Sequence, residues 1–332
     1  MTTMPARQAL HAHGSDVRAD ASLALVLPVL GLPTRFETNS PAVLGMVDES
    51  FGVWRGMPVP AAHEPPFVVR ILMRTGTEGN LDPVTIHHVC PDATRVLMCS
   101  PGSIAESDPS RRQAIAHVTT TLVAQRELFR SEMLEAMTLA LLSAFDRHPL
   151  HAAALMHGEH ALLLSAPSGT GKSTLSYLGA RAGLSVLSED RVWLQLSPTL
   201  RVWGWPGSIR LRTELPTHFP ELAHVDATPH RGGAHRLAIA PHRDRGVAPL
   251  FADRIAICTM QRGADVPWIE AIDRDALAAT LRRDTPPGFD RFPDREDAVL
   301  SAITRLGGWR LHLSDDPRAA LPLLHRMFAG LD

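Results

Sequence analysis

The sequence predicts an α/β protein built from two modules. Its 332 residues exceed the usual size of one domain. In the second half, an apolar segment at Ala161–Ser165 runs into a Gly-rich turn and then into a helical pattern that closes at Gly183. In the first half, short segments rich in β-branched and large apolar residues alternate with Gly, Asp and Pro, as the strands of a sheet do.

We expect three segments along the chain. Residues 1–20 are polar and lack periodicity, which predicts a loose tail. Residues 21–148 form a small α/β module, and residues 149–332 form a second module. The first module is expected to contain an extended segment at Thr34–Glu37 and a helix at Ala42–Trp54. A longer helix carries its apolar face on Leu134, Met137, Leu141 and Phe145, and Pro149 ends it. Short strands at Phe67–Met73, Val84–His88 and Arg95–Cys99 predict a small sheet.

In the second module, a strand at Leu184–Leu187 follows the helix, and Val192–Leu196 is expected to continue it. A strand at Trp309–Leu313 and an amphipathic helix at Pro317–Phe328 complete the module. Together these patterns favour strands that alternate with helices.

Charge and composition exclude several classes of partner. With 33 basic and 35 acidic residues the formal charge is −2, which provides no field for nucleic acid or an anionic membrane. No apolar run approaches the ~18 residues of a membrane span. The apolar stretch Ala21–Leu32 follows Asp16, Arg18 and Asp20, so it predicts a buried element and not a signal peptide. Three cysteines without CxxC spacing fit a reducing, cytoplasmic compartment.

The strongest local signal is a phosphate-binding loop of the Walker A type. The order strand, Gly-rich turn, helix lets backbone N–H groups converge on phosphate oxygens at the positive end of a helix. Lys172 is expected to reach the β- and γ-phosphates, and the hydroxyl of Ser173 to ligate Mg²⁺. Ala166 stands at the first Gly position, which a small residue tolerates when its φ is negative. The predicted nucleotide-binding residues are Ser168, Gly169, Thr170, Gly171, Lys172, Ser173 and Thr174.

Two adjacent carboxylates, Glu189 and Asp190, follow the strand at Leu184–Leu187. Such a pair beside a phosphate site is suited to hold Mg²⁺ and to accept a proton from an attacking hydroxyl. The alternative is a polar strand end with no chemical role. Two charges in an otherwise apolar strand are costly to bury unpaired, which favours the functional interpretation.

Residues 151–196 resemble the core of the HPr kinase/phosphorylase family. His151 precedes the loop at the family's distance, Gly183 and Asp190 follow at its spacing, and the loop matches at Ser168, Gly169, Gly171, Lys172 and Ser173. The resemblance implies a P-loop kinase domain of the HPr-kinase type. It implies that Asp190 is the base for an acceptor serine, that His151 and Lys172 are catalytic residues facing phosphate, and that Ser173 is a Mg²⁺ ligand.

The chain also departs from the family. Pro167 replaces the loop's Asp, and Glu189 replaces the first Asp of the pair. The family's Glu-Ile-Arg-Gly stretch is echoed by Ser208–Leu211 without its carboxylate, which leaves Glu189 or Glu214 as the second metal ligand.

These observations predict an ATP- and Mg²⁺-dependent phosphotransferase, a serine kinase acting on a peptide or protein. By analogy with relatives that phosphorylate lasso-peptide precursors, the substrate is a ribosomal peptide precursor. Two other functions stay open, a small-molecule kinase and a nucleotide-sensing binding module. A homo-oligomer also stays open.

Arg210 and Arg212 share one face of a strand, and this face points at phosphates or at solvent. The His/Arg-rich stretch 224–245 is a partner-binding loop or a solvated connection.

Overall fold

The computed structural model describes residues 21–331 apart from 59–64, 77–85, 91–94, 206, 230–234, 241–248, 287–288, 290–292 and 306. The tail expected at residues 1–20 and parts of the His/Arg-rich stretch 224–245 lie outside the described residues. The chain divides into two compact units, residues 1–142 and 143–332. Within the described part, no helix has the length and apolarity needed to cross a membrane.

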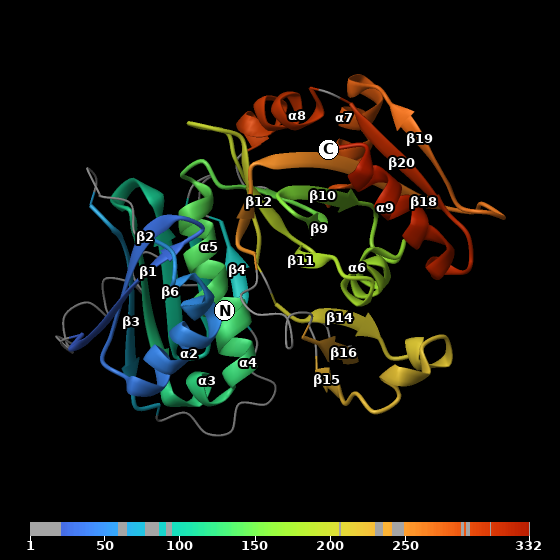
Figure 1. Cartoon of the computed structure of the whole chain (residues 1–332). Coiled ribbons are helices and arrows are strands. Elements are labelled where there is room, and N and C mark those ends of the chain that lie inside the picture. Colours follow the sequence, from blue (N-terminus) through green and yellow to red (C-terminus); the bar gives the residue numbers. More distant parts are fainter. Residues whose placement is uncertain are drawn as a thin grey trace, which may run out of the picture. The chain divides into compact units, whose positions relative to one another are not determined.

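The first unit is a seven-stranded mixed sheet with the strand order β1-β2-β3-β7-β6-β5-β4 (Figure 1). Its strands are β1 Leu23–Val29, β2 Leu32–Thr38, β3 Phe67–Arg74, β4 His87–Val89, β5 Val96–Ser100, β6 Ser103–Asp108 and β7 Gln113–Thr119. Its helices are α2 Pro41–Phe51, α3 Thr120–Ala124, α4 Arg126–Phe129 and α5 Ala136–Ser143, with a π-helical segment at Arg130–Glu135 between the last two.

The sheet is larger than predicted, because β6 and β7 were not predicted and because β1 and β2, expected as a buried element and an extended segment, also belong to it. Both strands alternate buried and partly exposed residues, a period of two that is visible in their sequences. The predicted strand at Val84–His88 corresponds to β4, while residues 84–85 lie outside the described part. The helix expected at Ala42–Trp54 is confirmed as α2 and a short 3₁₀ turn, and Ser40 caps its first turn by accepting from the Val43 amide.

The second unit is built on a six-stranded sheet with the order β11-β9-β10-β18-β20-β19, accompanied by a four-stranded sheet, β17-β13-β12-β8, and a three-stranded sheet, β14-β16-β15. Its strands are β8 His148–Leu150, β9 Ala152–His157, β10 His160–Ser165, β11 Ser185–Ser188, β12 Val192–Gln195, β13 Arg201–Trp203, β14 Ile209–Arg212, β15 Ala227–Pro229, β16 His235–Ile239, β17 Phe251–Ala252, β18 Arg254–Arg262, β19 Trp268–Ile272 and β20 Gly308–Leu313. Its helices are α6 Lys172–Arg181, α7 Arg274–Asp284, α8 Glu296–Thr304 and α9 Leu321–Ala329.

Helices cover both faces of this six-stranded sheet, which makes the second unit a three-layer α/β structure (Figure 1). The central strand β10 shows why its sequence is apolar throughout. Leu162 and Leu164 enter the core shared with α6 and α9, whereas Ala161 and Leu163 enter the core shared with α7 and α8. A strand buried on both faces has no polar side, so it reads as a continuous apolar run.

The prediction that Val192–Leu196 continues the strand before the acidic pair is wrong. β11 ends at Ser188 in the six-stranded sheet, and β12 begins at Val192 in the four-stranded sheet, between β13 and β8. The turn at Glu189–Arg191 separates them, because charged residues leave the apolar layer instead of being buried in it. The acidic pair therefore stands at a strand end, on a turn between two sheets.

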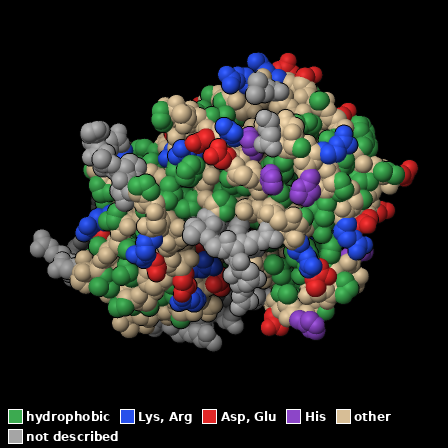
Figure 2. Space-filling view, in the orientation of Figure 1, with side chains coloured by type: hydrophobic (Ala, Val, Ile, Leu, Met, Phe, Trp, Pro, Cys, Tyr) green, Lys and Arg blue, Asp and Glu red, His purple; other side chains and the backbone are tan. Residues whose placement is uncertain are grey.

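On the face drawn in Figure 2, acidic and basic side chains are interspersed among apolar and uncharged ones. This mixture is in keeping with a formal charge of −2. No large area on that face carries charge of one sign only.

Candidate active site

The predicted phosphate loop, residues 166–173, connects the end of β10 to the start of α6. Gly169 and Gly171 have φ angles of 87° and 126°, a region that side chains with a Cβ rarely adopt. The backbone is also tied by Thr170, whose hydroxyl donates to the Pro167 carbonyl at 2.9 Å. Ala166 is fully buried and its φ angle is not positive. The absence of the first Gly of the motif therefore requires no strained backbone conformation.

Helix α6 presents an open N-terminus to this loop. Gly171 at its N-cap has no side chain to cap it, and the first turn contains no acidic residue. Its first amide groups and the positive end of its dipole therefore remain available for an anion. Ser168 is exposed in the loop, while Ser173 and Thr174 are half-buried in the first turn of the helix.

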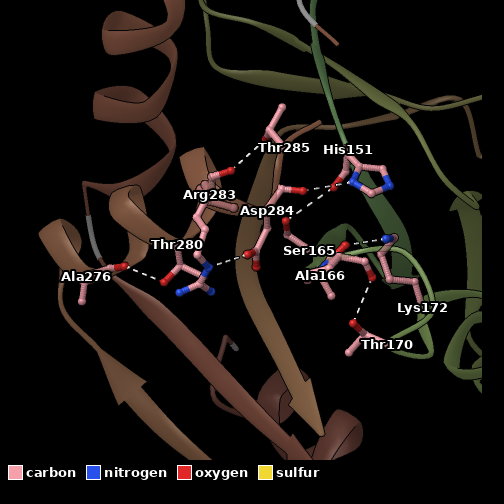
Figure 3. Close-up of polar contacts among 12 residues, drawn as sticks. His151, Ser165, Ala166, Thr170, Lys172, Ala276, Thr280, Arg283, Asp284 and Thr285 are labelled. Carbon is pink, nitrogen blue, oxygen red and sulfur yellow. Dashed lines mark hydrogen bonds and ion pairs between the residues drawn. The ribbon is translucent and has the colours of Figure 1, made fainter. Parts of the chain in front are cut away.

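Lys172 is buried at the start of α6, with 6% of its surface exposed. Its Nζ donates to the Ala166 carbonyl at 2.6 Å, so the ammonium group turns back over the loop (Figure 3). Burial lowers the pKa of Lys172, while the negative charges of Asp190, Glu189 and Asp284 act in the opposite direction. Lys172 is also the only lysine in the sequence, since every other residue counted among the 33 basic ones is an arginine.

Ser173 and Glu189 form a direct contact across the site, because the Ser173 hydroxyl donates to a carboxylate oxygen of Glu189. Burial raises the pKa of Glu189, and the Ser173 hydrogen bond counteracts that rise. A hydroxyl and a carboxylate oxygen are ligands that Mg²⁺ accepts, so this pair fits the expected ion. The alternative ligand, Glu214, is exposed after β14 and contacts its neighbour Thr213. The geometry thus favours Glu189 over Glu214.

Asp190 and His151 form an ion pair, with 3.3 Å between Nε2 of His151 and Oδ1 of Asp190. The hydrogen bond from His151 lowers the pKa of Asp190, although burial opposes it. The Asp190 side chain is 60% exposed, so it reaches solvent and any incoming acceptor, and water screens the pair.

The ring of His151 is held from its other side by the end of α7. Its Nδ1 lies 3.4 Å from the backbone carbonyl of Asp284 (Figure 3). The centre of its ring lies 5.4 Å from that of Phe289. Both ring nitrogens thus face oxygen atoms, which fixes the orientation of the ring from two sides. His151 itself is 6% exposed, so these contacts determine how the ring faces Asp190.

Three further residues lie at the site: Arg262 and Asp284 were not predicted from the sequence, and Arg212 was predicted to face either phosphates or solvent. Arg262, at the end of β18, donates from Nε to the Thr170 carbonyl at 2.8 Å, and a β-carbon at Gly171 would lie 3.5 Å from one of its terminal nitrogens. A β-carbon at Gly169 would lie 3.1 Å from a terminal nitrogen of Arg212, which decides that Arg212 faces the loop. In the described part of the chain, neither arginine forms an ion pair, so both charges are available to an anion.

Asp284 is the third of these residues. Its carboxylate is 1% exposed; Oδ1 accepts from Nε of Arg283 at 2.9 Å, and Oδ2 has no hydrogen-bond partner among the described residues. The sequence signals a helix end there, since Pro286 follows two residues later, but nothing local indicates that this helix end meets His151.

Comparisons with known proteins add one weak structural similarity. No protein-family model matches the chain, and no curated protein matches it either. Among solved structures, the Hpr(Ser) kinase/phosphatase from Coxiella burnetii is similar at 13% sequence identity with a TM-score of 0.31, over 55% of this chain and 98% of that one. A likeness this weak transfers neither residues nor activity to this chain.

Proposed function

We propose that this chain is an ATP- and Mg²⁺-dependent kinase that transfers the γ-phosphoryl group to the hydroxyl of a serine in a peptide or protein. The observation that carries the proposal is the convergence of a phosphate loop, two metal-compatible oxygens and an oriented carboxylate at one edge of one sheet. Ser173 and Glu189 touch each other, and Asp190 pairs with His151. A loop that only senses nucleotide has no need for the oriented carboxylate.

In the proposed reaction, the acceptor hydroxyl oxygen bonds to the γ-phosphorus while the bond from that phosphorus to the β–γ bridging oxygen breaks. ADP leaves with the electron pair of that bond, and the hydroxyl proton passes to Asp190. A lowered pKa keeps Asp190 ionised, so it orients the nucleophile from the start and takes the proton late in a loose transition state.

Positive charge around the loop is the main contribution of the chain to catalysis. Lys172, Arg212 and Arg262 supply three cationic groups near the loop, opposite the carboxylates Glu189 and Asp190. Positioned charges of this kind stabilise the charge that develops on the transferring group and on the leaving phosphate. Ser173 and Glu189 would hold Mg²⁺, which would supply further neutralisation of the phosphate charge.

The proposal is tested by incubating the protein with γ-labelled ATP and Mg²⁺, with and without peptides encoded by neighbouring genes, and measuring intact masses. We expect a phosphate-sized gain on a serine-bearing peptide, absent with Lys172→Ala. Phosphate on a metabolite instead would support the small-molecule kinase. Nucleotide binding without turnover on any acceptor would support the sensor and remove the proposed kinase.

A further inference from the structure

The strands that form the site end at one edge of the sheet in a defined order. β10 runs parallel to β18, and β18 runs parallel to β20. β11 also runs parallel to β10, because both are antiparallel to β9. The carboxyl ends of these four strands therefore lie on the same edge. Adjacent strands of a sheet are about 4.8 Å apart, so β10, β18 and β20 follow one another at that spacing, while β11 lies two spacings from β10 because β9 stands between them. Along that edge the order is acidic pair, phosphate loop, Arg262 and Ser314.

A cavity of about 390 Å³ opens at the far end of this order, beyond β18 and β20. It is lined by residues 264–267 after β18 and by residues 314–316 and Ala319 after β20. Its volume is in the range of small-ligand pockets. Crevices outside the carboxyl ends of parallel strands are where α/β sheets bind ligands.

This cavity adjoins the phosphate loop through two residues. A β-carbon at Gly171 would lie 3.5 Å from Arg262 and 3.7 Å from Leu313, the last residues of β18 and β20. The backbone amides of Gly263 and Ala264 both donate to the Leu313 carbonyl at 3.2 Å, which holds the two strand ends together. The cavity therefore begins within a few residues of the groups that touch the loop.

The in-line geometry of phosphoryl transfer determines which part of the nucleotide lies on the β18 and β20 side of the phosphate loop. The attacking and leaving oxygens lie roughly opposite each other across the γ-phosphorus. If Asp190 receives the acceptor on the β11 side, which rests on the proposed function, then the leaving ADP extends toward β18 and β20. A linear nucleotide with its phosphates on the loop then places its nucleoside over the cavity.

The lining suits a nucleoside better than a phosphate. Asp265 and Asp315 make no hydrogen bond or ion pair with another residue in the described part of the chain, so their carboxylates can accept from ribose hydroxyls or from a base amino group. Asp316, in contrast, already caps the turn that begins at Pro317. Val266, 72% exposed, and Ala319 offer apolar surface to a base. The carboxylates repel the phosphate end.

We propose that this cavity, between residues 264–267 and 314–319, binds the ribose and base of the nucleotide whose phosphates occupy the loop. Arg262 stands between the two subsites, because it bonds the Thr170 carbonyl and belongs to the strand that leads into the cavity. The phosphate loop and the nucleoside subsite are thus separate and independently removable parts of one binding site.

The test compares ATP with inorganic tripolyphosphate, which has the phosphates and no nucleoside. By titration calorimetry with Mg²⁺, we expect the protein to bind ATP about tenfold or more tightly than tripolyphosphate. Ala319→Leu narrows the cavity at its apolar wall without adding a ring that stacks on a base. It should lower ATP affinity to about that of tripolyphosphate and leave tripolyphosphate affinity unchanged. Ala278→Leu, in a second cavity between α7 and α8, is the matched control and should change neither.

Asp315→Ala provides a second test of the nucleoside subsite. It should weaken ATP binding while leaving tripolyphosphate binding unchanged or tighter, because it removes a nucleoside contact and a repulsive charge together. Equal affinities for ATP and tripolyphosphate in the unsubstituted protein would overturn the proposal. An unchanged ATP affinity in Ala319→Leu would also overturn the proposal, even if that variant no longer transferred phosphate to an acceptor. Binding of neither ligand would remove the proposed function, and the subsite with it.

Discussion

Nε2 of His151 lies 3.3 Å from Oδ1 of Asp190, and this ion pair joins the start of β9 to the turn after β11. The pair lowers the pKa of Asp190, so its stabilising effect is present above the ordinary carboxyl pKa and is lost as the pH falls through the lowered one. His151→Gln should move the Asp190 pKa upward, toward the ordinary range of an aspartate. A carboxyl-carbon NMR titration, with Asp190→Asn to assign the signal, measures the shift. An unchanged titration in His151→Gln would show that the pair does not form.

Asp190→Asn should abolish most transfer while leaving the phosphate loop intact. A positioned general base contributes about 10²–10⁴-fold to a rate, so a loss of that order is expected in kcat. ATP affinity, measured by calorimetry, should stay within about twofold, since the contacts that hold phosphate come from the loop, Lys172 and the arginines. Retained transfer in Asp190→Asn would remove its role as the base.

Glu189→Gln should make nucleotide binding less dependent on Mg²⁺. The substitution keeps the size of the side chain but removes the charge that a hard cation requires. We expect the gain in ATP affinity on adding Mg²⁺ to shrink by roughly tenfold, the order of one lost charge-assisted contact. Glu214→Gln is the control and should behave as the unsubstituted protein, because Glu214 is exposed and contacts Thr213. The opposite pattern would assign the metal to Glu214.

Lys172 can be labelled alone, because the chain has no other lysine. An acyl-phosphate derivative of ATP should transfer its acyl group to Nζ and release ATP, giving one modification by intact mass. The lowered pKa of Lys172 favours this reaction by raising the fraction of free amine. Excess ATP should block labelling, and Lys172→Arg should remove it. Labelling that ATP does not block would contradict the placement of phosphates on this loop.

Gly204→Ala tests the packing that holds the acidic turn. A β-carbon at Gly204 would lie 2.2 Å from the Leu187 carbonyl oxygen, so the chain must move to admit it. We expect the free energy of unfolding of the second unit to fall by about 1–3 kcal/mol, as for other overpacked sites, in a urea titration. Gly207→Ala is the control, since its nearest neighbour would be at 3.8 Å, an ordinary contact. Equal stability of the two variants would contradict the close approach at Leu187.

The local elements were predictable where neighbouring residues alone determine them. β2, α2, β3, β5, β10, β20 and α9 lie where periodicity and breakers placed them. The phosphate loop belongs to this group, since Gly169 and Gly171 allow its positive φ angles and the start of α6 follows directly. β12 was misplaced because strand propensity does not tell which sheet a strand joins.

The Gly-rich loop between β10 and α6, the acidic pair after β11 and the single lysine can be recognised in the sequence alone, because each depends only on residue types and on residues adjacent in sequence. Only the folded chain shows that Arg262 donates to the Thr170 carbonyl and that the Asp284 carbonyl faces His151. The same holds for the cavity that residues 264–267 form with residues 314–316 and Ala319. These contacts depend on how β18, β20 and α7 are arranged around β10. The pairing of strands distant in sequence is fixed by the packing of the whole core and not by any local pattern.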